Sequence, residues 1–193
     1  MLKLTNNMSF QDQTFKKINF TQNDLSTEYD NCTFKNCQFT GIQLNSIAFS
    51  ACHFFECDLS NVKLTNTSFK DVHFEKCKML GLRFEDCKTF LLEFSFSECI
   101  LNFSSFYGLN IQKQRFENCQ LHEVDFTECN LSRGIFKECE LNNAIFERTN
   151  LEKVDLQSAR NFSISPNENK LKGAIFSKSD LYGLVSHLGI IVK

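Results

Sequence analysis

The sequence predicts an all-β solenoid, and three features of its repeat pattern carry that prediction. Across residues 116–156, an aromatic or aliphatic residue recurs at every fifth position without a slip. A small or apolar residue stands two positions before most of these repeat centres, and the other positions are mostly polar. Of the 22 phenylalanines, all except Phe55, Phe90, Phe103 and Phe162 lie on repeat centres. Self-similarity at a fixed period indicates a repeat architecture.

A period of five residues fits neither a helix nor a flat strand. Five residues turn about 500° on an α-helix, so successive repeat centres would lie about 140° apart. On a flat strand, the odd spacing would place successive centres on opposite faces. The chain must therefore turn once per repeat, so that every centre points inward. Two apolar positions in each five then form a continuous interior that no single repeat could bury alone.

The pattern of a small residue, any residue, and then Leu or Phe resembles the bacterial pentapeptide-repeat family. This resemblance covers about residues 8–160, which is most of the chain. It implies a right-handed quadrilateral parallel β-helix, with four repeats in each coil.

The predicted elements follow the register of the repeat. Residues 1–7 are a polar lead-in, and residues 8–160 form the β-helix. The register loses one residue near 26–30 and gains two near 89–96, where we expect a bulge or a small corner loop. The polar segment 161–169 predicts a loop.

Residues 161–193 end in a predicted α-helical cap. Ser177 and Asp180 have the spacing of a capping box, and Gly189 is the expected stop signal. A short amphipathic helix there would cover the open end of the solenoid. Because some members of the family dimerise through such caps, the resemblance implies a homodimer, and a monomeric cap is the alternative. The expected dimerisation residues are Leu181, Leu184, Leu188 and Ile190.

The ten cysteines all occupy the position two before a repeat centre. They are Cys32, Cys37, Cys52, Cys57, Cys77, Cys87, Cys99, Cys119, Cys129 and Cys139. The spacing predicts one column of Cys37, Cys57 and Cys77 and another of Cys99, Cys119 and Cys139. Stacked side chains point the same way, which disfavours disulfides. Zinc sites with four thiolates use close CxxC pairs, and the sequence contains none, so zinc is not expected. We therefore expect reduced thiols that act as small hydrophobic residues.

Three outward residues are candidates for a surface metal site. His53 and His73 stand one predicted coil apart, and Glu93 is next in the same spacing. An open site would need a further ligand and supporting hydrogen bonds. We therefore expect solvated histidines, no metal and no cofactor. The sequence also has no P-loop, GxGxxG, GxSxG or HExxH motif, so we expect no enzymatic activity.

Charge is the feature that bears on partners. Residues 117–155 carry nine acidic and four basic residues, a net charge of −5. The predicted coils also place opposite charges beside one another, as in Glu117 with Lys137 and Glu128 with Arg148. The chain begins without a recognisable signal peptide and has no long apolar run, so we expect a cytoplasmic protein and no membrane contact.

The chain resembles the quinolone-resistance and microcin-immunity members of the family, without their long loops. The resemblance implies binding to a type II DNA topoisomerase, DNA gyrase or topoisomerase IV, by imitation of DNA, and no direct binding of nucleic acid. The alternative is a structural or interaction scaffold with an unrelated protein partner. The predicted partner-binding residues are Glu117, Glu123, Asp125, Glu128, Glu138, Glu140 and Glu147.

Overall fold

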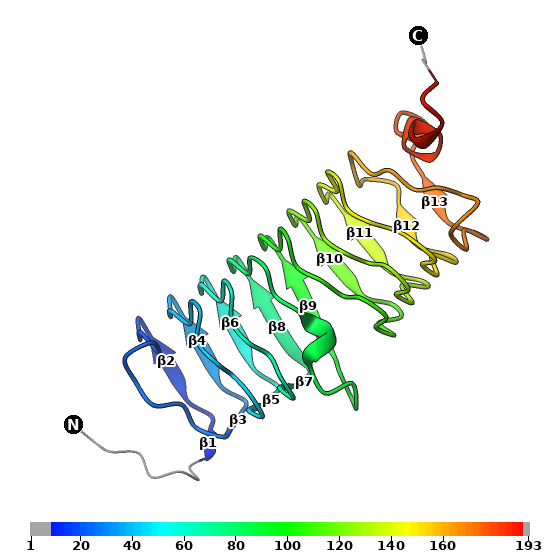
Figure 1. Cartoon of the computed structure of the whole chain (residues 1–193). Helices are drawn as coiled ribbons and strands as arrows, with labels where there is room; N and C mark the ends of the chain where they lie inside the picture. The colour runs from blue at the N-terminus through cyan, green and yellow to red at the C-terminus, as the bar shows by residue number, and fades with distance from the viewer. Residues whose placement is uncertain (1–8, 191–193) are drawn as a thin grey trace.

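The computed structural model describes residues 9–190 as a parallel β-solenoid. Its coils stack along one axis, with the N-terminal and C-terminal coils at opposite ends of a rod (Figure 1). The strands are β1 (Ser9–Gln11), β2 (Thr14–Lys16), β3 (Glu28–Asp30), β4 (Thr33–Lys35), β5 (Ala48–Ser50), β6 (His53–Phe55), β7 (Ser68–Lys70), β8 (Val72–Glu75), β9 (Phe94–Ser97), β10 (Arg115–Glu117), β11 (Ile135–Lys137), β12 (Asp155–Leu156) and β13 (Ile175–Phe176). The predicted lead-in, 1–7, lies outside the described residues.

Each coil has four sides. The first side carries a nine-stranded sheet in the order β2-β4-β6-β8-β9-β10-β11-β12-β13. Single parallel bridges join the coils on the second side, from Asn19 to Arg160, and on the third side, between Gln43 and Ile145. The fourth side carries the sheet β1-β3-β5-β7 and, further along the chain, bridges from Asn110 to Lys170. The predicted four-sided parallel β-helix is confirmed.

The interior is a set of aromatic ladders. On the first side the rings of Phe96 and Phe116 stack with their centroids 5.4 Å apart and an angle of 3° between the planes. On the third side Phe106 and Phe126 stack at 5.3 Å. Rings on neighbouring sides meet edge to face, as Phe116 and Phe126 do at 5.9 Å. Both arrangements are favourable for aromatic pairs, so phenylalanine suits every repeat centre.

The chain turns at its corners through residues in the left-handed conformation. Asn118, Glu123 and Glu128, each two positions after a repeat centre, have φ of 52°, 54° and 58°. This conformation is costly for a residue with a Cβ. A hydrogen bond to the next coil offsets the cost, because each of these amides donates to a carbonyl there, as Asn118 does to Lys137 at 2.8 Å. Turning therefore does not depend on glycine.

Two coils depart from the usual length. Stacked residues are 20 apart in most coils, but 19 apart in the first, where Asp12 meets Asn31. One later coil is longer: His73 stacks on Ser95, so the residues stacked there are 22 apart in the sequence. After the 3-10 turn η1 (Phe84–Asp86), residues 88–93 form a loop in place of the fourth-side strand of this coil.

The long coil changes the predicted arrangement of the cysteines. Ile100 donates its amide to the carbonyl of Cys77, so Cys99 lies above Cys77. The two predicted columns are therefore one column of six thiols. All ten cysteines are buried, as predicted, and none is joined in a disulfide. Eight of the ten thiols, all except those of Cys87 and Cys129, lie within hydrogen-bond distance of backbone carbonyls, as in Cys77, whose Sγ lies 3.3 Å from the oxygen of Phe54. Burial raises the pKa of the Cys52 thiol to about 12.

The C-terminal α-helix is not confirmed. Two short 3-10 turns, η2 (Leu181–Leu184) and η3 (Ser186–Leu188), stand in its place. Asp180 accepts hydrogen bonds from the hydroxyls of Ser177 and Ser179, and its side chain caps no amide of η2. Glycine in the middle of η2 weakens any helix there. No helix among residues 9–190 has the length and apolar character needed to cross a membrane.

The loop predicted at 161–169 contributes to the core. Phe162, which the repeat pattern leaves out of phase, is buried and packs on Phe176 with ring centroids 5.4 Å apart. The amide of Ile164 donates to the carbonyl of Gly183 at 2.9 Å. This hydrogen bond fastens the 3-10 turns to the last coils.

Candidate protein-interaction surfaces

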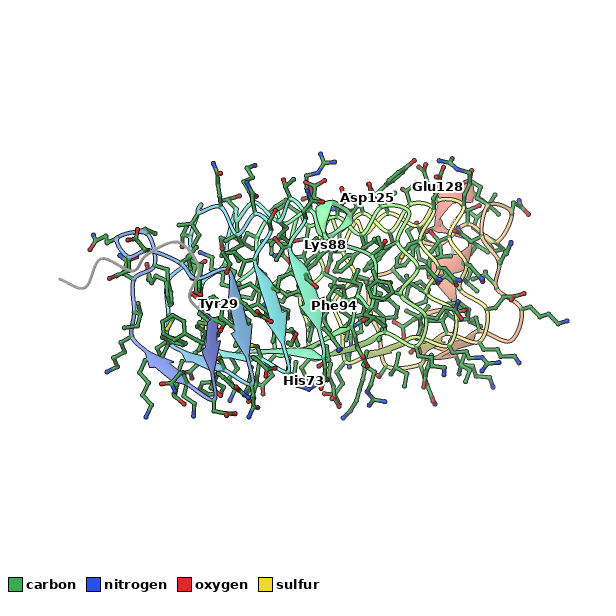
Figure 2. The ribbon with its side chains drawn as sticks, turned by 90° about the horizontal axis from the view of Figure 1, so that it is seen from below. Tyr29, His73, Lys88, Phe94, Asp125 and Glu128 are labelled. Carbon is green, nitrogen blue, oxygen red and sulfur yellow. The ribbon has the colours of Figure 1, made fainter. Side chains whose placement is uncertain are left out.

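The seven predicted partner-binding acids lie on three sides of the rod. Glu117 and Glu138 are on the first side, at and just after the strands β10 and β11. Glu123 and Glu140 belong to the second side, and Asp125, Glu128 and Glu147 to the third. Asp125 and Glu128 follow one long edge of the rod, and His73 lies at the opposite edge (Figure 2). The acids therefore form a band around the C-terminal half, not a single acidic face.

Three of these acids are paired with cations of the neighbouring coil or corner. Glu117 pairs with Lys137, and Glu128 with Arg148 at 3.0 Å, which confirms both predicted pairs. Arg148 also lies 3.9 Å from Glu147. The hydrogen bond from Lys137 lowers the pKa of Glu117. Exposed pairs of this kind contribute little to stability, but they remove net charge from the surface.

The other four acids have no ion pair within residues 9–190. Glu123 and Glu138 are exposed, and Asp125 and Glu140 are half-buried. Asp125 accepts the amide of Thr127 in its own turn, at 2.8 Å. Among the seven acids, those without an ion pair thus lie on the second side and where it meets its two neighbours.

The expected column of His53, His73 and Glu93 forms only in part, because His53 stacks on His73 but Glu93 does not follow them. Because the coil at β8 is longer, Ser95 takes the place predicted for Glu93, and its hydroxyl lies 2.6 Å from Nδ1 of His73. His53 pairs instead with Glu75 at 3.2 Å. Across the described part of the chain, no group of three or more His, Cys, Asp or Glu residues is placed to hold a metal ion.

The long coil creates a surface feature that the repeat pattern did not predict. Phe90 and Leu91 in the loop 88–93 are 80% and 55% exposed. A depression of about 390 Å³ beside them is lined by Leu92, Phe94 and Ile111, among others. The two-residue slip marked the position of the loop, but its exposed apolar side chains followed no repeat signal, because Phe90 is out of phase.

The C-terminal turns present apolar side chains at the end of the rod. Leu181, Leu188 and Ile190 are exposed, and Leu184 packs partly against the core. Of the four predicted dimerisation residues, three are thus available to a partner. Ile191 and Val192, which follow them, lie outside the described residues.

Comparisons with known proteins agree with this architecture. Three overlapping segments, 27–94, 82–156 and 109–184, match the family described as "Pentapeptide repeat region". A search of curated proteins gave no significant match. One solved structure of a trypsin-treated form of QnrB1, described as a plasmid-mediated fluoroquinolone resistance protein, superposes with a TM-score of 0.64 at 17% identity, over 97% of this chain and 92% of that one. A second trypsin-treated form of QnrB1 superposes with a TM-score of 0.51 at 19% identity, over 97% of this chain and 98% of that one. At these identities the likeness shows the fold.

Proposed function

This chain belongs to the pentapeptide-repeat family, and on that premise we propose that it is a non-catalytic scaffold that binds a type II DNA topoisomerase, DNA gyrase or topoisomerase IV. One observation carries the proposal. Glu123, Asp125, Glu138 and Glu140 present carboxylates without ion pairs on a rod whose coils repeat at about 4.8 Å. A surface that binds duplex phosphates would meet a negative, regularly spaced ligand there. Such a partner places the protein in the cytoplasm.

The charge density limits how much DNA the rod can imitate. About 37 Å of duplex, the length of seven to eight coils, carries about 22 phosphate charges. The acidic band has seven carboxylates, and three of them are paired. The proposed contact therefore covers only part of a DNA-binding surface, and its affinity falls as salt rises.

A supercoiling assay tests the proposal. The protein at micromolar concentration is expected to change supercoiling by purified gyrase or topoisomerase IV, measured with and without a quinolone. The substitutions Glu123→Lys, Glu138→Lys and Glu140→Lys together should reduce that effect about tenfold, because they replace attraction with repulsion at the contact.

A matched variant separates local contact from total charge. Asp24→Lys, Glu28→Lys and Glu56→Lys make the same change of charge at three exposed acids of the N-terminal half. This variant should stay within about twofold of the natural protein. No effect of the natural protein on either enzyme would rule out the topoisomerase. A pull-down would then test the alternative, a scaffold for an unrelated protein.

The same premise leads us to expect a homodimer through the C-terminal turns. The double substitution Leu181→Asp and Leu188→Asp should convert the dimer to a monomer. Both leucine side chains are exposed in the single chain and would be buried at the interface of the dimer, where aspartate is unfavourable. Sedimentation velocity measures the mass directly. Phe90→Asp, at a still more exposed apolar residue outside the turns, should leave the dimer intact. A natural protein that sediments as a monomer at high concentration would exclude this arrangement.

A further inference from the structure

The corner between the fourth and first sides carries a column of cations in the C-terminal half. Lys113, Arg133 and Lys153 are exposed and occupy the left-handed corner position of three successive coils, with φ of 62°, 61° and 58°. Their amides donate to the next coil in sequence, which fixes the stacking: Lys113 to Ser132, Arg133 to Glu152 and Lys153 to Lys172. None of the three forms an ion pair with another residue of 9–190.

The surface along this column is hollowed. A shallow depression of about 370 Å³ is lined by Gln112, Lys113, Ser132, Arg133, Glu152 and Lys153. Gln112 and Lys113 also line the depression beside the loop 88–93, which Arg115 borders as well. The two depressions therefore adjoin. We call them together the basic trough.

Recognition in the trough must depend on side chains. The corner amides already donate to carbonyls of the next coil, so a bound chain cannot add to the sheet as a further strand. The cationic side chains are free to bind anions. At the end near the loop, the apolar residues Leu92, Phe94 and Ile111 line the trough.

We propose that the basic trough binds an extended acidic segment of a partner protein. Carboxylates on one face of an extended chain recur about every 6.7 Å, and long Lys and Arg side chains on coils about 4.8 Å apart can reach them. An apolar residue of the segment would contact the apolar end of the trough. The basic trough is separate from the acidic band. It binds an acidic ligand, whereas the acidic band is proposed to bind a basic surface.

The acids within the trough favour a peptide over nucleic acid. Glu152, which precedes Lys153 in the chain and whose carbonyl accepts the amide of Arg133, also lines the trough, and Asp71 and Glu93 border the end near the loop. A nucleic acid strand carries a phosphate at every nucleotide, so it would place negative charge against these carboxylates. A peptide can place an uncharged residue opposite each of them.

The test measures fluorescence anisotropy of a labelled peptide of about 12 residues in which glutamate alternates with serine, so that the carboxylates lie on one face; when extended, it is longer than the trough. The full-length protein should bind it at low salt, and about 0.5 M salt should abolish binding. Lys113→Glu, Arg133→Glu and Lys153→Glu together should weaken binding about tenfold or more. Glu152→Gln should strengthen it about twofold, because a repelling charge is removed.

The control uses three other exposed cations, at Lys16, Lys17 and Lys35. Their replacement by glutamate makes the same change of net charge, and Lys17 also has the left-handed conformation, with φ of 55°. This variant should bind the peptide within about twofold of the natural protein. Circular dichroism of both variants, which should match that of the natural protein, checks that they are folded.

Three outcomes would overturn the proposal. The natural protein could fail to bind the peptide at low salt, or the control variant could lose as much affinity as the trough variant. A single-stranded oligothymidylate of equal length could also bind more tightly than the peptide and be lost with the trough variant, which would make the ligand a nucleic acid.

Discussion

Phe126→Ala is expected to lower the free energy of unfolding by about 3–5 kcal/mol, the usual cost of removing a buried aromatic side chain. The ring of Phe126 is fully buried, and its centroid lies 5.3 Å from Phe106 and 5.2 Å from Phe146 in the third-side ladder. Its edges meet Phe116 and Phe136 on the first side, at 5.9 and 5.8 Å. Alanine would leave a cavity that coils held by backbone hydrogen bonds cannot close.

Chemical denaturation followed by circular dichroism measures this loss. Solenoids are stabilised by contacts between neighbouring coils, so a weakened coil can also unfold before the rest. The expected signature is therefore a lower midpoint, a broader transition, or both.

Glu128→Ala is the matched control for this substitution. Glu128 is exposed and accepts hydrogen bonds from Arg148 and from the hydroxyl of Tyr107, at 3.1 Å each. Exposed contacts of this kind are weak, so the change in stability should be below about 0.5 kcal/mol. Equal losses at Phe126 and Glu128 would contradict the assignment of inward and outward positions.

Gly183→Ala is expected to destabilise the C-terminal turns, although alanine is the better helix former. A methyl group on Gly183 would lie 2.4 Å from the carbonyl oxygen of Phe162 and 2.6 Å from its ring. The contact is with backbone, which cannot rotate aside. Either the turns lift from the last coils or Phe162 shifts, and overpacking of this kind costs about 1–3 kcal/mol.

Thermal unfolding combined with limited proteolysis measures this effect. Loosened turns should be cut sooner, within residues 165–190, while the coils stay resistant. Gly108→Asn is the control, because Gly108 has φ of 66°, open space surrounds it, and asparagine tolerates this conformation. A higher midpoint for Gly183→Ala would mean that helix propensity outweighs the contact with Phe162.

Most of the inward positions could be predicted, because they depend only on the repeat. The core includes Phe116, Leu121 and Phe126 at repeat centres and Cys119 and Val124 two positions before centres. The pairs Glu117–Lys137 and Glu128–Arg148 could be predicted as well, because both lie beyond the long coil, where stacking is regular.

The failures lie at the long coil and at the C-terminal end. Ser95 replaces Glu93 beside His73, because two added residues shift every later residue relative to the coils before it. The basic trough was not predicted, because the charges were summed along the chain, and the sum over residues 117–155 is negative. Lys113, Arg133 and Lys153 nevertheless follow the 20-residue spacing of the regular coils, so reading the charges by column, as for Glu117 and Lys137, would have grouped them.

By itself, the sequence determined the period and the inward side chains, because each five residues contain the turn and the buried positions; the four-sided coil was implied by the resemblance to the family. The tertiary structure alone decided which residues are neighbours across the long coil, since stacking depends on the full length of every coil. A two-residue insertion changes that length while the backbone hydrogen bonds re-form beyond it. The structure also decided that the described residues close with 3-10 turns, because Gly183 packs closely on Phe162, which is distant from it in sequence.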